Sequence, residues 1–414
     1  IISKEDFFNA DWVNLLKFKV SYGEQGNDNI GSFRYVDTYT LINANGHPAA
    51  QPATKGNKDI TWEKNGNFNV GVEFELFNTR LNGSIDGFYR TTHDMLMQFP
   101  LPASSGFMGY YDNIGNMMNA GIELDLQATP IRTRDFTWTI GLNMTWYKNK
   151  IVKLPDERKA SHIDRWGELW GYTSGSTAYL EDIPMYTYWM KKNAGVDPVS
   201  GKSLYYMDEY EIDPDTKQPI LDEEGERIYT GKVITTDDYD KGDNYLCGTA
   251  LAPVYGGFNT MFEYKGFDLS FAFNYQIGGQ VYDSGYQALM TPSISNSAGS
   301  NIHADVFKAW TAEKPSNTIP RWQYNDNNVA QTQSRFLTDA SYLSLQQINF
   351  GYTLPDNVVK KLFLNKLRVY FAAENIWVWS QRQGLDPRQS FTGGNNINYY
   401  APMRTFSGGF TLSF

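Results

Sequence analysis

The sequence Phe68-Asn-Val-Gly-Val-Glu-Phe-Glu-Leu76 alternates at every position between an apolar residue and a polar residue or glycine. Successive side chains of a β-strand point to opposite faces, so this segment predicts a strand with one apolar and one polar face. The segment Leu81–Tyr89 follows with its apolar residues at the same two-residue spacing. Only Asn78-Thr79 is needed to connect the two segments, so together they predict a tight antiparallel hairpin.

Matching runs recur along the chain, at 122–127, 136–146, 267–276 and 405–414. The alternating segments mostly cover about 10–16 residues, whereas soluble strands usually have about 5–6. A tilted strand needs about 9–11 residues to cross a bilayer. One apolar face would also suit a soluble sandwich, so the length of the runs is what favours an all-β, transmembrane antiparallel β-barrel.

The connections between these runs alternate between short and long. Short ones lie at Asn78-Thr79, Pro130–Arg134, Lys265-Gly266 and Pro355–Leu364, and long ones lie at about 41–59, 96–116, 285–340 and 381–400. Outer-membrane barrels have short periplasmic turns and longer extracellular loops. The pattern therefore supports the barrel interpretation independently of the strand lengths.

Thirteen spanning strands are expected if Phe414 lies on the periplasmic side. They are 14–22, 33–40, 60–77, 80–94, 117–129, 135–150, two near 166–173 and 186–195, 254–264, 267–282, 342–354, 366–379 and 401–414. Single-chain bacterial barrels close with an even number of strands. An odd number therefore predicts the C-terminal part of a larger barrel, with 151–253 as an acidic insertion.

One predicted strand changes the parity of its apolar residues. Leu343 and Leu345 are at odd positions and share one face of the strand, whereas Ile348, Phe350 and Tyr352 are at even positions and share the other face. The change occurs at Gln346-Gln347 and indicates either a β-bulge or a change in which face is buried.

The composition excludes several classes of protein. A net charge of −10 argues against nucleic acid as a partner, because phosphate binding needs a basic surface. Cys247 is the only cysteine, so no intrachain disulfide forms and the redox compartment stays open. No apolar run is long enough for a transmembrane helix, and Ile1–Asp11 has no leader pattern, which suggests a mature chain or a fragment.

The negative charge is concentrated in one segment. Residues 208–243 contain thirteen acids and four bases, a net charge of −9. Asp213, Asp215 and Glu224 have a loose calcium-loop spacing, but Gln218 stands where such a loop needs glycine. A solvated hairpin insert outside the cell is therefore favoured over a calcium site, and no other metal or cofactor is expected.

No pattern of catalytic residues is present. The four histidines, at 47, 93, 162 and 303, lack metal-ligand spacing, and no nucleophile elbow, P-loop or dinucleotide fingerprint occurs. Glu73 and Glu75 share a strand face and could be imagined as a glycosidase pair, although a polar lumen face explains them better. The chain is therefore predicted not to be an enzyme.

Aromatic residues divide into two groups. Trp138, Trp146, Phe267 and Tyr275 lie near strand ends on apolar faces, as in the aromatic girdles of membrane barrels. The rings in or near loops could bind sugar or peptide or pack loop against loop; they are Trp166, Trp170, Tyr172, Trp189, Trp322 and Tyr324.

Several long motifs carry a family resemblance. The stretch Arg335-Phe-Leu-Thr-Asp-Ala-Ser-Tyr-Leu-Ser-Leu-Gln-Gln-Ile-Asn-Phe-Gly-Tyr-Thr-Leu-Pro355 closely resembles the C-terminal hallmark of SusC-like (SusC/RagA-type) TonB-dependent transporters. Further matches are Trp62–Asn65, Phe68–Val72, Arg80–Asp86, Asn113–Gly115, Asn119–Glu123, Lys265–Ser270, Leu367–Ile376, Gly384–Pro387, Pro402–Phe406 and Phe410–Phe414. Residues 151–253 match least.

The resemblance implies a barrel of about 22 strands in the bacterial outer membrane, with a plug and a TonB-contacting segment that this chain lacks. It implies a SusD-like surface lipoprotein as partner, energy supplied through TonB, and import of a large nutrient, an oligosaccharide more than a peptide. It leaves open a dimer of such complexes. It also identifies Phe410, Leu412 and Phe414 as the outer-membrane assembly signal.

Under this interpretation the import path is lined by polar-face residues near the outer strand ends, with loop aromatics above them. The candidates are Arg90, Asn119, Glu123, Asn143, Asn274, Trp166, Trp170, Trp322 and Tyr324. Two other classes stay open from the residues alone: a secreted, soluble carbohydrate-active β-protein, and a surface adhesin barrel without transport.

Overall fold

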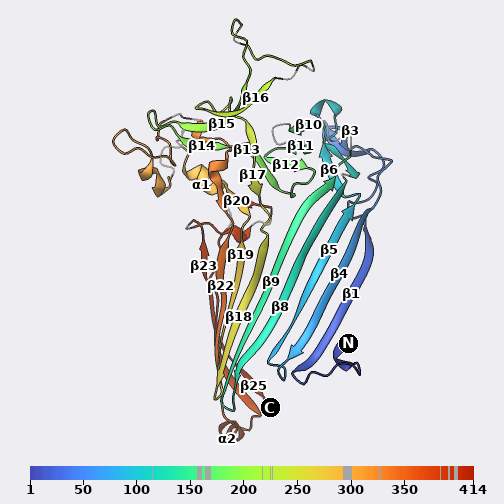
Figure 1. Ribbon diagram of the computed structural model, residues 1–414, viewed down its shortest axis with the longest axis vertical. Helices are drawn as coiled ribbons and strands as arrows, with labels where there is room; N and C mark the ends of the chain where they lie inside the picture. Colours follow the sequence, from blue (N-terminus) through green and yellow to red (C-terminus); the bar gives the residue numbers. More distant parts are fainter. Residues whose placement is uncertain are drawn as a thin grey trace.

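The computed structural model describes residues 1–113, 115–155, 161–163, 169–216, 218–223, 225, 227–291, 301–324, 326, 328–382, 384–389, 392–395 and 400–414. Its main feature is a tall antiparallel sheet of ten strands, here called the wall (Figure 1). In sheet order the strands are β1 (Val13–Asn27), β4 (Glu63–Leu76), β5 (Leu81–His93), β8 (Asn116–Arg132), β9 (Phe136–Lys153), β18 (Val254–Tyr264), β19 (Phe267–Ile277), β22 (Tyr342–Thr353), β23 (Lys366–Ser380) and β25 (Thr405–Ser413).

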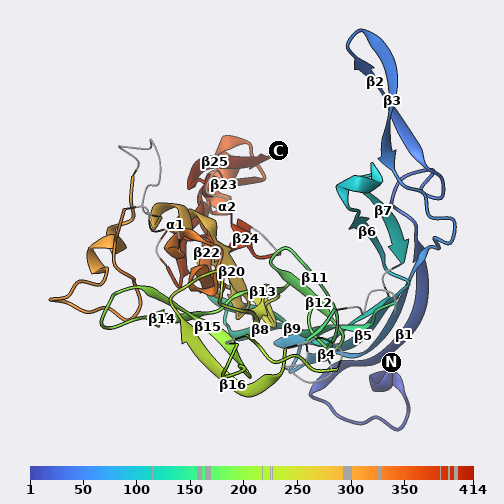
Figure 2. The same ribbon diagram turned by 90° about the horizontal axis from the view of Figure 1, so that it is seen from above.

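The wall curves when seen from above (Figure 2). β1 and β25 form its two edges, and neither edge pairs with another strand within the described ranges. The all-β, antiparallel barrel-type fold expected from the alternating sequence is therefore present as an open wall rather than as a closed cylinder.

Pairing register assigns the two faces of the wall. Leu124 of β8 lies opposite Ile85 of β5 and Met144 of β9, so the apolar residues of neighbouring strands share one face. The opposite, polar face carries cross-strand ion pairs, with Lys17 Nζ 3.1 Å from Glu73 Oε2 and Lys19 Nζ 3.0 Å from Asp86 Oδ1. One face thus suits lipid and the other suits water.

Long and short connections lie at opposite ends of the wall, as the sequence predicted (Figure 1). At the end with short turns, here the inner end, Lys265 and Gly266 join β18 to β19 with φ of 47° and 90°. Such left-handed pairs match the twist of a two-residue hairpin, and glycine adopts them without strain.

The strand count was wrong: the wall has ten strands, not thirteen. Residues 33–40 only enter an outer hairpin, and 186–195 contribute to small outer sheets, as do the described residues of 166–173. β1 pairs directly with β4, with no strand from 33–40 between them, and therefore runs outward. With ten strands, the odd-number argument for a larger barrel no longer applies.

The outer end carries several small sheets (Figures 1 and 2). β2 (Thr38–Ala44) pairs with β3 (His47–Thr54), and β6 (Leu96–Pro100) with β7 (Gly109–Asn113). The described residues between β9 and β18 form two more sheets. One contains β10 (Ser161–Ile163), β11 (Leu169–Ser174), β12 (Thr177–Leu180), β13 (Thr187–Lys191) and β17 (Asn244–Thr249), and the other contains β14 (Asn193–Val196), β15 (Ser203–Tyr210) and β16 (Tyr229–Thr236). β20 (Gln280–Asp283) pairs with β21 (Leu337–Asp339) and β24 (Gly394–Asn395).

Helices are few and short. The described α-helices are α1 (Ser284–Leu289) and α2 (Asp356–Val359), and the described 3₁₀ segments are Ile2–Lys4, Ala103–Ser105, Ala304–Lys308, Asn328–Ala330, Ser334–Phe336, Lys360–Leu362 and Pro387–Gln389. Among the described residues, no helix has both the length and the apolar character needed to span a membrane.

The parity change in β22 is a β-bulge. The register shifts between Leu345 and Gln347 in the pairing with β23, and a matching shift occurs opposite in β19. Leu343 then lies beside Tyr275, and Phe350 beside Leu269, so both remain on the apolar face. The extra residue at the bulge resolves the two alternatives that the sequence left open.

Candidate ligand-binding cavity at the outer end

A cavity of about 480 Å³ lies where the polar face of the wall meets the outer loops. Strands β5, β8, β9, β18, β19 and β22 supply its floor, and segments before β18, around β20 and after β23 supply its roof. Its lining residues are Phe88, Arg90, Asn119, Glu123, Tyr147, Ala250, Leu251, Ala252, Tyr255, Gln276, Gln280, Val281, Ala340, Tyr342 and Pro387.

Arg90 and Glu123 form the charged part of this cavity. Arg90 Nη2 lies 3.6 Å from Glu123 Oε1, and both side chains are about half exposed. The Arg90 guanidinium also lies 4.5 Å above the centre of the Phe88 ring, which restricts where it can point. The cavity therefore offers donors and carboxylate acceptors side by side with no net charge from this pair.

Asn119 links the cavity to the loops above it. Its Oδ1 accepts a 2.8 Å hydrogen bond from Nδ2 of Asn149, which is buried. Asn149 Oδ1 in turn accepts a 2.8 Å bond from the backbone N–H of Met185 in the outer region. These two hydrogen bonds hold the segment at Met185 in a fixed position relative to β8 and β9, because a buried amide needs hydrogen-bond partners.

Aromatic rings make up another part of the lining. Tyr147 and Tyr255 meet edge to face with their ring centres 6.0 Å apart. The backbone N–H of Tyr147 donates a 3.0 Å hydrogen bond to the carbonyl of Pro253, which positions the segment entering β18. Rings beside polar groups suit ligands that have both an apolar face and hydroxyl or amide edges.

The roof of the cavity is a small packed core. Val281 and Ala340 lie near the two ends of the β19–β22 connection, Leu385 lies in the β23–β25 connection, and the three are buried in one cluster. Beside them, the Tyr188 hydroxyl donates to the Gly393 carbonyl at 2.8 Å, and burial raises the pKa of Tyr188 to about 12. The tyrosine therefore stays a neutral hydrogen-bond donor at physiological pH.

The structure brings together three of the predicted path residues, Arg90, Asn119 and Glu123, in this cavity. Asn143 and Asn274 lie just below it on the polar face, where each is paired in register with Gly257. These five residues thus form one continuous polar surface at the outer end of the wall.

The predicted loop aromatics that the structure describes do not line the cavity. Trp170 is on β11 and partly exposed, and Tyr324 is largely exposed in the loop between β19 and β22. Trp322 lies in that same loop and also outside the lining. Trp166 lies outside the described residues.

Sequence reasoning missed two groups of lining residues. Phe88, Tyr147 and Tyr255 share the polar-face parity of their strands, so counting parity near the outer ends could have found them. The roof residues carry no such signal, because Ala250–Ala252, Val281 and Pro387 meet around the cavity only through the arrangement of connections far apart in sequence.

In the acidic segment, 208–243, a carboxylate predicted as a calcium candidate makes hydrogen bonds within its own turn. Asp213 Oδ1 accepts hydrogen bonds from the backbone N–H groups of Asp215 and Thr216, at 2.8 and 2.9 Å, so it stabilises its own turn. Glu224, the third calcium candidate, lies outside the described residues. Within the described ranges, no three His, Cys, Asp or Glu side chains come together as metal ligands.

Cys247 is half-buried in β17 of the outer region, and the structure gives it no disulfide partner. Burial raises the pKa of its thiol to about 11. Reactive cysteines need an accessible thiolate, so this side chain behaves as a small apolar residue rather than as a nucleophile.

Comparison with known families shows to which protein family the ten-stranded wall belongs. The family model described as "TonB dependent receptor-like, beta-barrel" matches residues 8–277. The chain belongs to the TonB-dependent receptor β-barrel family. The transmembrane barrel fold and the outer-membrane location predicted from the sequence are therefore confirmed, and the apolar face of the wall is its lipid-facing side.

Two curated relatives show which branch of the family is involved. TonB-dependent receptor P39 of Formosa agariphila is 28% identical over 97% of this chain and 40% of its own length. TonB-dependent receptor SusC of Bacteroides thetaiotaomicron is 27% identical over 99% of this chain and 39% of its own. The chain thus spans about two fifths of these relatives' length, and the resemblance to SusC-like proteins is confirmed.

Solved structures agree with this assignment. The RagAB peptide transporter matches the whole chain with a TM-score of 0.80 and 26% identity, covering 42% of the matched chain. The RagAB peptide importer in its "closed-closed" state gives a TM-score of 0.81 with the same identity and coverage. The chain therefore has the fold of a SusC/RagA-type barrel, a family of receptors and transporters rather than of enzymes.

Proposed function

We propose that this chain is the C-terminal barrel portion of an importer that moves a large nutrient across the outer membrane. The cavity bounded by Arg90, Glu123 and the outer loops is the observation that carries this proposal, because it lies on the water-facing side of the wall at its outer end. The proposed role is binding and transport, not catalysis.

An oligosaccharide is the substrate class that this cavity fits best. The Arg90–Glu123 pair carries no net charge, and Asn119, Gln276 and Gln280 add amide groups to the same lining. Such groups hydrogen-bond hydroxyls as both donors and acceptors. The tyrosine rings supply flat apolar surface against which a sugar ring packs.

A peptide is the second candidate. The solved relatives that match the whole chain are named as a peptide transporter and importer. An extended peptide also presents paired donors and acceptors, and its side chains would contact the rings of Tyr147 and Tyr255. Both candidates use the same cavity, so they differ in the ligand recovered and not in the site.

We also propose that the rest of a longer protein completes the barrel. Lipid cannot hydrogen-bond an exposed strand edge, so the edges of β1 and β25 need partner strands to be stable in a bilayer. The proposal includes a barrel of about 22 strands with a plug, a TonB-contacting segment and a SusD-like lipoprotein as partner, and the resemblance to SusC-like proteins is what supports it. Calcium in the outer loops is not part of the proposal.

Purification of the full-length protein from its native membrane tests this function. Mass spectrometry of the purified material should identify a co-purifying surface lipoprotein and a bound oligosaccharide. A bound peptide would instead select the second candidate. Purification of a protein that is soluble without detergent, or one without lipoprotein or ligand, would count against import.

Arg90→Ala should weaken binding of the recovered ligand by about tenfold, because it removes a charge-assisted donor and leaves Glu123 unpaired. Lys17→Ala is the matched control, since it breaks an ion pair of similar exposure on the same face but outside the cavity. Isothermal titration with the full-length protein measures both. Equal losses in the two variants would mean that the cavity does not bind the ligand.

Deletion of Phe414 should lower the yield of protein in the outer membrane. Phe410, Leu412 and Phe414 are exposed in the last segment of the chain, with Phe410 and Leu412 on the lipid-facing side of β25. This aromatic end is proposed as the signal for barrel assembly. Immunoblots of fractionated membranes measure the yield, and an unchanged yield would exclude that role.

A further inference from the structure

A second pocket of about 460 Å³ lies at the edge of the wall, between the outer part of β23 and the segment leading into β25. Pairing between these strands ends at Glu374 and Thr405, and beyond that point the two segments separate. Asn375 adopts a left-handed φ of 52° and its Nδ2 donates to the Met403 carbonyl at 3.2 Å. The opening is therefore built into the backbone at this point.

One side of this pocket contains an arginine whose position is fixed by hydrogen bonds. Arg388 donates to Asp386 through Nε at 2.8 Å and through Nη2 at 2.7 Å, the two-pronged geometry of a strong ion pair. Its Nη1 donates to Ser344 Oγ at 3.0 Å. Asp386 therefore neutralises Arg388 and holds it in place while the guanidinium still borders the pocket.

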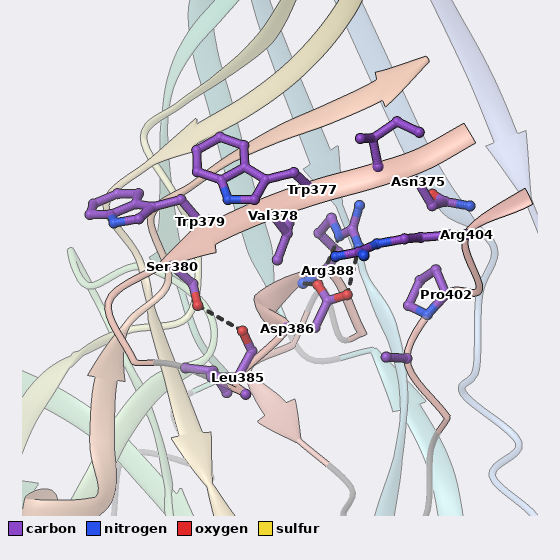
Figure 3. A pocket seen from close by; sticks show the side chains of 13 residues that line it. Asn375, Trp377, Val378, Trp379, Ser380, Leu385, Asp386, Arg388, Pro402 and Arg404 are labelled. Atoms are coloured by element: carbon purple, nitrogen blue, oxygen red, sulfur yellow. Dashed lines mark hydrogen bonds and ion pairs between the residues drawn. The ribbon is translucent and has the colours of Figure 1, made fainter. Parts of the chain in front are cut away.

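Arg404 enters the same pocket from the opposite side. Figure 3 shows its side chain pointing across the pocket toward Arg388 and Asp386. Within the described ranges, Arg404 makes no ion pair or hydrogen bond through its side chain. Two guanidinium groups thus approach one carboxylate, which leaves one positive charge without a partner among the described residues of the pocket.

The remaining lining shows the level of this pocket in the membrane. Trp377 and Trp379 lie on the lipid-facing parity of β23, opposite Leu345 and Leu343 of β22, and both are about half exposed. Tryptophans concentrate where the bilayer meets water. The uncompensated arginine is therefore at the height of the lipid headgroups and of the water layer above them.

We propose that this pocket binds an oxyanion, a phosphate or carboxylate group, with Arg404 as its principal ligand and Arg388 as the second. A guanidinium offers a planar pair of donors that fits such a group in a two-pronged manner. Two sources have this chemistry: the phosphates of an outer-leaflet lipid, and a free anion or acidic solute from the water layer. The site is separate from the cavity of Arg90 and Glu123 and does not depend on import.

The test uses the full-length protein in detergent, with wild type and Arg404→Gln compared. The lipid probe is purified lipopolysaccharide, with dephosphorylated lipopolysaccharide as its counterpart, and the free probe is inorganic phosphate. Native mass spectrometry measures lipid retention, and titration measures phosphate. Arg134→Gln is the matched control, because Arg134 is an exposed arginine in the β8–β9 turn at the inner end.

The expected result is that Arg404→Gln loses affinity for a phosphorylated probe about tenfold or more, while Arg134→Gln keeps wild-type affinity. Arg404→Lys should recover only part of the loss, because an ammonium lacks the planar fork. Loss for the phosphorylated lipid alone assigns the site to lipid, and loss for free phosphate alone assigns it to a solute. Wild-type affinity of Arg404→Gln for both probes would overturn the proposal.

Discussion

Leu124→Arg is expected to prevent most of the protein from assembling in the outer membrane. Leu124 lies at the middle of β8 on the lipid-facing side, between Ile85 and Met144 of the neighbouring strands. Placing an arginine against lipid at mid-bilayer depth costs roughly 2–4 kcal/mol. Folding into lipid vesicles, followed by urea titration of the full-length protein, measures this change in free energy of unfolding.

Gln127→Arg is the control for this experiment. Gln127 is on the same strand but on the polar face, opposite Asn82 and Gly141, where the new charge meets water. Its free energy of unfolding should change by less than about 1 kcal/mol, as for an ordinary surface substitution. If both variants assembled like wild type, Leu124 would not face lipid and the assignment of the two faces would be wrong.

Arg368→Ala is expected to destabilise the inner end of the wall by about 1–3 kcal/mol. Arg368 of β23 reaches across β22 to Asp268 of β19, with Nε 2.9 Å from Oδ1 and Nη2 2.5 Å from Oδ2. The Arg368 side chain is 28% exposed and the Asp268 side chain is 18% exposed. Removing the arginine therefore leaves a mostly buried carboxylate without its partner.

Gly351 provides an independent way to break the same ion pair. A Cβ added at Gly351 would lie 2.3 Å from Arg368 Nη2 and 2.6 Å from Asp268 Oδ1, so Gly351→Ala must displace the pair while keeping both charges. The double variant Asp268→Asn, Arg368→Gln should recover part of the loss, because no unpaired charge remains. Urea titration in vesicles measures all three, and a wild-type midpoint for Arg368→Ala would mean the pair contributes nothing to the wall.

The wall could be predicted from the sequence because a bilayer imposes a strict pattern on it. A strand between lipid and water needs apolar and polar residues in alternation, as in 68–76 and 136–146. The outer hairpin of β2 and β3 also forms a sheet, but this sheet is separate from the wall. Local periodicity therefore could not separate 33–40 or 186–195 from true wall strands, and the predicted number of spanning strands was thirteen instead of ten.

The site was predictable only in part, for a related reason. Arg90, Asn119 and Glu123 lie on wall strands. Their odd or even position in the strand and their distance from its outer end therefore predicted that they share one surface. The loop tryptophans were chosen by residue type, and loops are positioned by contacts between residues far apart in sequence. The roof formed by Val281, Ala340 and Leu385 is of this kind, since Val281 and Ala340 lie near opposite ends of the β19–β22 connection and Leu385 lies in the β23–β25 connection.

Uptake of the co-purified ligand by living cells tests the central proposal most directly. Cells carrying the full-length protein are compared with and without TonB, using a labelled form of that ligand. Import energised through TonB predicts accumulation only when TonB is present, and accumulation reduced by Arg90→Ala but not by Lys17→Ala. Equal accumulation with and without TonB would contradict it.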